Sequence, residues 1–271
     1  MKRFVINHLV VAALVVSAAL MSSCGKDDNG DKIKLLETIT SDWGDDGYGV
    51  TKFEYDDQNR IIKISGYWDG KLEPIKTLNY GDDWIKVTWL NYDEYGDRVI
   101  VFTKTGNNTI TLSTNADGYI ETLTIDNDGY LSKWVDVAFD DNRSQEVTFQ
   151  YQNGNLTKMT NISLRDGKKG FEEVFEFKYD DKKSPFYHCK TPKWFMQFWF
   201  FFDDIFGIGF KNNIIELIGF GEEIGYSNFS FSIEYIYEYD SDGFPTKQTS
   251  IEYEDGEVVN TRINTFTYIT R

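Results

Sequence analysis

Cysteine, histidine and basic residues are all scarce in this 271-residue chain. It has two Cys and two His, too few for a zinc ribbon or a disulfide scaffold, and they leave little for histidine-based catalysis. Lys and Arg number 28 against 44 Asp and Glu, a formal net charge of −16. A chain with no basic face cannot make the phosphate contacts that nucleic acids require, so we expect no nucleic-acid partner. We also expect no metal and no other cofactor.

Aromatic residues are plentiful, at 17% of the chain, and charged residues make up 27%. This composition excludes a disordered acidic tail or a low-complexity linker. The length suits one large all-β domain or two average domains.

The first residues have the pattern of a secretion signal. Lys2 and Arg3 precede an apolar run over residues 9–20, which is shorter than the ~20 residues that a membrane-spanning helix needs. Small residues then lead to Cys24, a match that resembles the bacterial lipobox. The resemblance implies a signal peptide over residues 1–23 and a lipidated Cys24, which would anchor the chain in outer-membrane lipid.

Directly after that cysteine come Lys26, Asp27 and Asp28. They resemble the export signal that sends Bacteroidetes lipoproteins to the outer face of the outer membrane, which implies display on the cell surface. We expect residues 24–32 to form an acidic flexible tether, and the alternative to surface display is a protein that faces the periplasm. Without residues 1–23 the chain has 26 basic and 44 acidic residues, so its formal charge of −18 would be repelled by an anionic leaflet.

From residue 50 onward, alternating segments end in an aromatic residue followed by a turn of Asp, Asn and Gly. Clear copies lie at 53–61, 125–131, 149–156 and 237–244, and weaker ones at Tyr80, Phe139 and Tyr179. Spacings of 25 to 28 residues between copies indicate a repeated pair of hairpins. Strict alternation, as in 229–239, is typical of half-buried antiparallel strands, and pairs such as Asn153-Gly154 suit tight turns.

These features predict an all-β fold, an antiparallel meander that curls or closes into a barrel-like sheet and so removes its edges. We expect residues 33–271 to form a single domain of this kind. An aromatic-rich and partly helical insert interrupts it over residues 186–220.

The repeated units resemble the tyrosine–aspartate repeats of large bacterial surface and toxin-shell proteins. A closer resemblance is to Bacteroidetes lipoproteins with a domain of unknown function and a porin-like fold. It rests on the lipobox, the Tyr-Asp units, Ser184-Pro185-Phe186 before the insert, Asn212-Asn213 after it, and the late unit at 237–243. It implies a barrel-like domain without catalytic residues. This chain departs from the pattern in the abundance of Phe and Trp in its insert.

A barrel of this kind need not span a membrane. Many strands look shorter than the ~9–11 residues that a spanning strand needs, and a lipid anchor would be redundant on a spanning barrel. We therefore expect a soluble, monomeric barrel with its apolar face inward.

The insert contains the candidate ligand or plug residues Trp194, Phe198 and Trp199. Pro192 can start a helix, and these aromatics recur at helical spacing, although the segment is apolar nearly all round, as in a buried helix. One interpretation is a plug that fills one end of the barrel, with residues 205–210 and 214–220 completing the core. The others are a lid over an apolar or carbohydrate ligand, or an exposed patch for a partner.

Three other groups could carry chemistry, but each has a simpler explanation. The acid pairs Asp203-Asp204 and Glu222-Glu223 consist of neighbours that point apart, unlike the carboxylates of a glycosidase. His188-Cys189 would likewise diverge in an extended segment. We therefore predict no catalytic residues.

The Asp-x-Asp-Gly units at 126–129 and 240–243 resemble the start of a calcium loop. They lack the bidentate Glu at the twelfth position, where Val137 and Ile251 stand instead. Turn formation explains them, and weak surface calcium binding stays open.

Three functions remain. The leading hypothesis is a non-enzymatic, lipid-anchored lipoprotein that binds an unidentified ligand or partner. The second is a structural or shielding lipoprotein with a filled barrel, and the third is an acidic-residue glycan hydrolase.

Overall fold

The computed structural model describes residues 32–44, 47–93, 96–114, 120–137, 143–202, 211–223 and 229–271. Residues 1–31, with the expected signal peptide, Cys24, Lys26, Asp27 and Asp28, lie outside the described residues. The unit from Lys34 to Arg271 contains, within its described part, one helix and 17 strands. They are β1 (Lys34–Asp42), β2 (Tyr48–Tyr55), β3 (Ile61–Trp68), β4 (Lys71–Leu72), β5 (Ile75–Tyr80), β6 (Trp84–Asp93), β7 (Gly96–Lys104), β8 (Thr109–Thr114), β9 (Ile120–Ile125), β10 (Leu131–Val137), β11 (Arg143–Gln152), β12 (Asn155–Arg165), β13 (Lys168–Tyr179), α1 (Lys193–Phe202), β14 (Ile214–Glu223), β15 (Phe229–Tyr239), β16 (Pro245–Glu254) and β17 (Glu257–Thr270).

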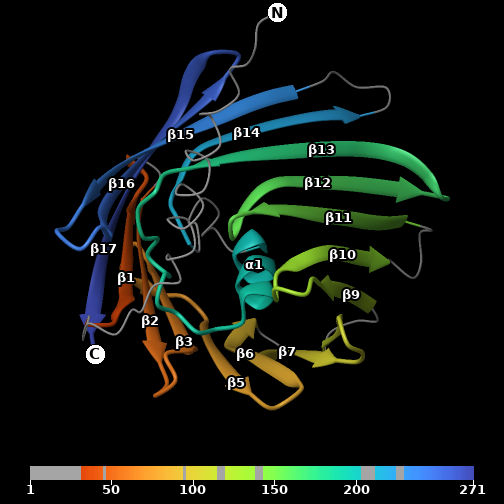
Figure 1. The fold of residues 1–271 in the computed structure, drawn as a ribbon, viewed down its shortest axis with the longest axis horizontal. Helices are drawn as coiled ribbons and strands as arrows, with labels where there is room; N and C mark the ends of the chain where they lie inside the picture. The colour runs from red at the N-terminus through yellow and green to blue at the C-terminus, as the bar shows by residue number, and fades with distance from the viewer. Residues whose placement is uncertain are drawn as a thin grey trace, which may run out of the picture. The chain divides into compact units, whose positions relative to one another are not determined.

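The strands form a closed antiparallel barrel (Figure 1). Each strand pairs with the next along the chain, and β17 returns to pair with β1, so that Lys34 lies opposite Thr270. The two-residue β4 pairs with the last two residues of β3, and β5 pairs with Lys63 and Ile64 of the same strand. Without the short β4, 16 strands form the wall of the barrel. The predicted all-β meander is thus confirmed, and it closes fully.

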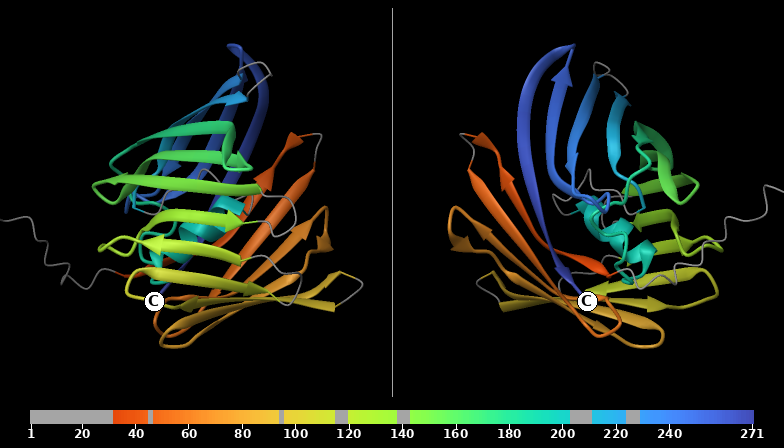
Figure 2. Two further views of the ribbon diagram at one scale, coloured as in Figure 1. Left: turned by 90° about the vertical axis from the view of Figure 1, so that its right-hand side faces the viewer. Right: turned by 60° about the vertical axis from the view of Figure 1, so that its left-hand side comes forward.

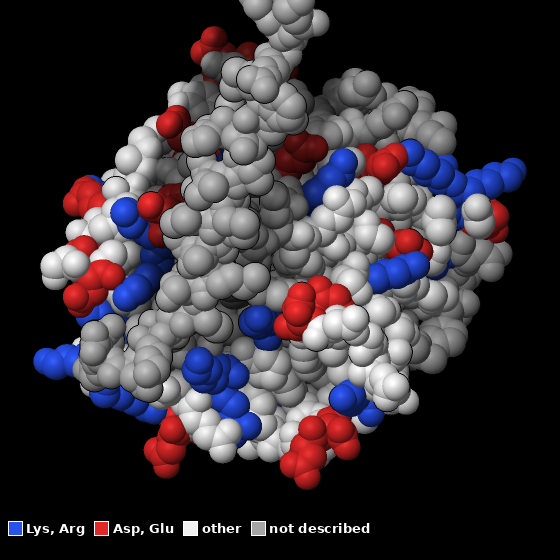
Figure 3. All heavy atoms as spheres, viewed as in Figure 1, with Lys and Arg blue, Asp and Glu red and all other residues white. Residues whose placement is uncertain are grey.

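Side-chain alternation gives the wall two different faces. In β2, Phe53 and Tyr55 are buried while Lys52 and Glu54 are exposed. On the exposed face, neighbouring strands are joined by ion pairs such as Lys63–Glu54 at 2.8 Å, Lys133–Glu146 at 2.7 Å and Lys247–Glu238 at 3.1 Å. Figure 3 shows that basic and acidic side chains are interspersed over the described surface on this side of the molecule.

The clear copies of the repeated unit lie at one end of the barrel, called here the turn end, where residues 56–60, 126–130 and 240–244 connect strands. The weaker copy at Phe139 lies outside the described residues. In each turn the first aspartate accepts two backbone N–H bonds, as Asp240 Oδ1 does from Asp242 at 2.9 Å and Phe244 at 3.0 Å. Asp126 binds the amides of residues 128 and 130 in the same way. The Asp-x-Asp-Gly pattern is therefore turn chemistry.

Five tyrosines near the turn end share one structural role. The hydroxyl of each donates to a backbone carbonyl at or near the start of a neighbouring, earlier strand, so one ring ties two strands together inside the wall. The pairs are Tyr55–Leu36 (2.8 Å), Tyr80–Ile61 (2.5 Å), Tyr151–Leu131 (2.6 Å), Tyr237–Ile214 (3.0 Å) and Tyr268–Pro245 (2.7 Å). Of these five, only Tyr55 directly precedes a turn aspartate, and Tyr239, which precedes Asp240, donates to the Asp180 carboxylate instead.

Strand length differs from the expectation along half of the wall. β2, β3, β5 and β8–β10 have six to eight residues, whereas β11–β17 have ten to fourteen. Figure 2 shows the long C-terminal strands extending well beyond the level of α1. Strand length therefore does not exclude a spanning barrel, because only part of the sheet has strands shorter than the ~9–11 residues that a spanning strand needs.

Candidate functional site

The aromatic insert is built into one of the aspartate turns. Asp180 Oδ1 accepts the amide of Lys182 at 3.0 Å and that of Asn213 at 3.0 Å, and its own N–H donates to the Asn213 carbonyl. Asp240 makes the same three bonds with residues two and four positions later. Thus Asn213 closes the turn, and residues 214–220, predicted to belong to the insert, instead form wall strand β14 because they alternate like the other strands.

Helix α1 forms where the sequence predicted it and lies inside the ring of strands (Figure 1). It begins after Pro192, whose carbonyl accepts the N–H groups of Phe195 and Met196, both at 3.1 Å. Gln197 is buried and accepts the amide of Leu131 at 2.9 Å. This bond attaches the helix to the start of β10.

An aromatic cluster fixes the helix against the wall. Phe102 of β7 contacts Trp194, Phe195 and Phe198, with ring centroids 5.9, 5.2 and 5.5 Å apart. From β10, Trp134 meets Phe198 edge to face at 5.9 Å. Such pairs contribute ~0.5–1.5 kcal/mol each beyond the area they bury.

The three candidate residues of the helix line two different hollows. Phe198 and Trp199 line a cavity of about 1200 Å³, whereas Trp194 lines a smaller hollow of about 430 Å³ among the turns. Phe198 and Trp199 are 7% and 4% exposed, and Trp194 is half-buried. The helix therefore packs inside the turn end and at the same time forms a wall of the large cavity.

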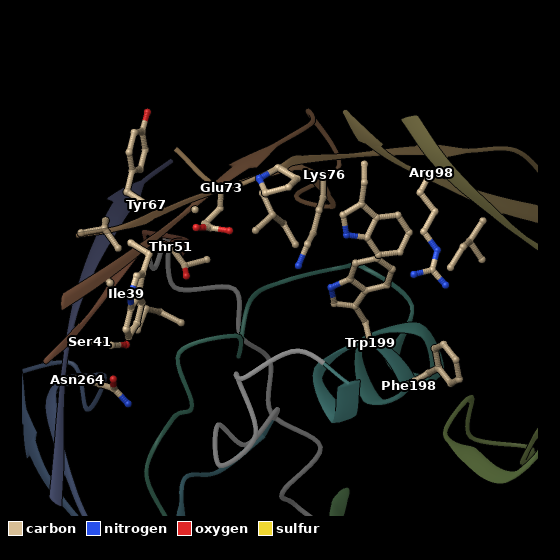
Figure 4. Close-up of a pocket in the computed structure, with 18 of the residues that line it drawn as sticks. Ile39, Ser41, Thr51, Tyr67, Glu73, Lys76, Arg98, Phe198, Trp199 and Asn264 are labelled. Atoms are coloured by element: carbon tan, nitrogen blue, oxygen red, sulfur yellow. The ribbon is translucent and has the colours of Figure 1, made fainter. Parts of the chain in front are cut away.

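The large cavity is bordered by the strand halves farther from the turn end. Five of the seven tryptophans of the chain line it, namely Trp43, Trp68, Trp89, Trp134 and Trp199. Figure 4 shows Glu73, Lys76 and Arg98 pointing into the space that the Trp199 ring borders. The cavity therefore combines flat aromatic surfaces with charged groups.

Two carboxylates face each other across adjacent strands of this cavity. Glu121 of β9 is the register partner of Asp136 of β10, and both line the cavity. Burial raises the pKa of Glu121, which also accepts the Trp134 indole N–H at 3.0 Å, and burial likewise raises the pKa of Asp136. Within the described part of the chain, Asp136 Oδ1 and Trp199 Nε1 are buried without a hydrogen-bond partner.

Sequence reasoning missed these charged residues, although the strand pattern contained the signal. Each stands two or four positions from a buried apolar residue and so shares its face: Lys76 with Leu78, Arg98 with Phe102, Glu121 with Leu123, and Asp136 with Trp134. A charge on the apolar face of an alternating strand must be buried or must border a cavity.

The other candidates do not form a site among the described residues. His188 Nδ1 lies 3.1 Å from the Lys34 amide, and burial raises the pKa of the Cys189 thiol, the reverse of an activated nucleophile. Asp203-Asp204 and the side chains of Glu222-Glu223 lie outside the described residues. Where side chains are described, no three His, Cys, Asp or Glu residues are grouped to hold a metal. In the described ranges, no helix is long and apolar enough to cross a membrane.

The barrel is similar to two solved structures of porin-like proteins. One is from Bacteroides uniformis ATCC 8492, with a TM-score of 0.51 and 18% identity over 86% of this chain and 96% of that one. The other is from Bacteroides vulgatus ATCC 8482, with a TM-score of 0.51 and 13% identity over 88% and 99%. No family model and no curated protein matches the chain. The shared feature is the porin-like fold.

Proposed function

We propose that this chain is a non-enzymatic, lipid-anchored barrel that binds a ligand in its large cavity. The observation that carries the proposal is the cavity of about 1200 Å³ bordered by five tryptophans and by helix α1. Ligand sites are concave, largely apolar and lined by a few convergent polar groups, which is the composition found here. A filled, purely structural barrel would not retain a cavity of this size.

A cavity-blocking variant tests ligand binding. Thr51 points into the cavity (Figure 4), whereas the next residue, Lys52, lies on the exposed outer face. We expect cis-parinaric acid or a neutral oligosaccharide such as cellohexaose to quench tryptophan fluorescence saturably in the purified full chain. Thr51→Trp should abolish the response and Lys52→Trp should preserve it. Failure of both kinds of probe, or equal binding by both variants, contradicts the proposal.

The anchor is proposed from the sequence. Cys24 would be diacylated and N-acylated, and several acyl chains give the two-signal attachment that stable anchoring needs. Cys24→Ala should yield an unprocessed or released form, and normal acyl labelling of that variant would refute the assignment. Ion pairs across the outer wall support a barrel that does not span the bilayer, because charged side chains on a lipid-facing wall are costly.

Surface display is a separate proposal. Replacing Lys26, Asp27 and Asp28 by Ala should leave lipidation intact and reduce cleavage by protease added to whole cells. Equal cleavage of both forms would exclude this export signal and favour the periplasmic face.

A glycan hydrolase is the second candidate, and the facing Glu121–Asp136 pair is the observation that favours it. Both groups line the cavity, and a raised pKa is what the general acid of a glycosidase needs, while the other group would have to stay ionised as base or nucleophile. Incubation of cellohexaose with the wild-type chain and with Glu121→Gln distinguishes the candidates. Cleavage by the wild type alone would establish the hydrolase and replace the non-enzymatic proposal.

A further inference from the structure

The residues that line the large cavity indicate which class of ligand it binds. This inference rests on the proposal above that the cavity binds a ligand. We infer that the cavity binds a neutral oligosaccharide, with the open face of Trp68 as its stacking surface.

Trp68 is held as a flat platform at the edge of the cavity. A Cβ atom at Gly49 would lie 3.1 Å from the Trp68 ring, and one at Gly47 would lie 3.0 Å from it, so the ring rests closely on two residues without side chains. Trp43 contacts the same ring edge to face, with centroids 5.9 Å apart. Trp68 is still 36% exposed, and a seated ring with this much open area offers a rigid aromatic surface to a ligand.

The polar groups of the cavity argue against an alkyl chain. Glu73 points into it from the connection before β5, Lys76 from β5 and Arg98 from β7 (Figure 4). An acyl chain would lie against the Glu73 carboxylate and offer it no hydrogen-bond donor, which is costly. A sugar ring has hydroxyl groups for such partners around its edge and C–H groups on the face that stacks on tryptophan.

Unpaired polar atoms reinforce the argument. Trp199 Nε1, Asp136 Oδ1 and Asn264 Oδ1 belong to lining residues, and no group in the described part of the chain pairs with them. Buried polar atoms in native proteins are normally paired by protein, water or ligand. These atoms comprise one donor and two acceptors, and sugar hydroxyls can serve either kind.

The volume of the cavity and the charges of its lining residues indicate the length and the charge of the ligand. A volume of about 1200 Å³ exceeds the ~300–1000 Å³ that is usual for small-molecule sites, so several sugar units fit better than one. Among the lining residues, Glu73, Glu121 and Asp136 outnumber the two basic ones, Lys76 and Arg98. This balance disfavours an anionic polysaccharide.

Titration calorimetry of the purified full chain tests the inference. The probes are cellohexaose, maltoheptaose, laminarihexaose, xylohexaose and mannohexaose, with oligogalacturonate as the anionic comparison and cis-parinaric acid as the apolar one. We expect saturable binding of at least one neutral probe and little binding of the anionic one. Trp68→Ala should weaken that binding by about tenfold or more, as truncation of an interface hot spot does.

Trp84→Ala is the matched control, because Trp84 is 42% exposed and lines the smaller hollow at the turn end. Equal melting temperatures for the two variants would show that both fold. Binding of cis-parinaric acid without any saccharide would overturn the inference and leave ligand binding standing. Loss of saccharide binding in Trp84→Ala rather than in Trp68→Ala would overturn it too, and no binding of any probe would remove both proposals.

Discussion

Five tyrosines near the turn end donate their hydroxyl to a main-chain carbonyl. Burial raises the pKa of Tyr151, and its hydroxyl donates to the Leu131 carbonyl at 2.6 Å. Tyr151→Phe keeps the ring and leaves that carbonyl unpaired, which costs ~1–3 kcal/mol. We expect the melting temperature to fall by about 2–4 °C for each kcal/mol. Tyr253→Phe, whose hydroxyl contact is long and exposed, is the control, and equal effects of the two changes would contradict this role.

The carboxyl of Glu121 makes stability depend on pH. Its folded pKa is raised above the ordinary 4.5, so the native state holds the proton more tightly than the unfolded chain does. The resulting penalty is absent below pH 4.5 and grows as the pH rises through the folded pKa. Glu121→Gln should therefore raise the melting temperature at pH 7 and not at pH 4.

The outer-wall Glu146, which pairs with Lys133, provides the comparison for that experiment. Glu146→Gln should give no gain at pH 7, because this carboxylate sits on the exposed face with its partner. A gain from Glu121→Gln of equal size at both pH values would contradict the burial argument.

Helix α1 is the element that decides how much of the barrel is filled. Phe198 is 7% exposed and packs against Phe102 and Trp134, so Phe198→Ala should cost ~3–5 kcal/mol. Trp194 is half-buried at the other end of the helix, and Trp194→Ala should cost less. Thermal unfolding of both variants checks the order. An unchanged melting temperature for Phe198→Ala would contradict the interpretation that the helix fills part of the barrel core.

The strands and the helix could be predicted because their signals are local. Alternation in 229–239 and the spacing of Trp194, Phe198 and Trp199 depend on a few neighbouring residues. The cavity depends instead on register: Glu121 meets Asp136 through strand pairing, and β17 meets β1 across the whole sheet. The boundary at Asn213 was missed because an apolar strand and an apolar insert look alike in composition.

At the scale of the whole molecule, the barrel has two unlike ends. The turn end is packed by α1 and its aromatic cluster, and the tyrosine hydroxyls join its strands. Beyond the helix, the longer C-terminal strands continue (Figure 2), and the large cavity lies among tryptophans and charged groups. The outer face carries ion pairs between neighbouring strands, as expected of the proposed barrel whose wall meets water.

Thiol labelling of the cavity tests the central claim most directly, since a ligand can bind there only if molecules can enter. Ser41 lines the cavity (Figure 4), Ser230 is exposed on the outer wall, and Met159 is fully buried. Each is changed to Cys in the full chain, and its reaction with a maleimide is followed by peptide mass spectrometry. We expect Ser41→Cys to react at a rate approaching that of Ser230→Cys and to be protected by a bound oligosaccharide. A rate as low as that of Met159→Cys would contradict it.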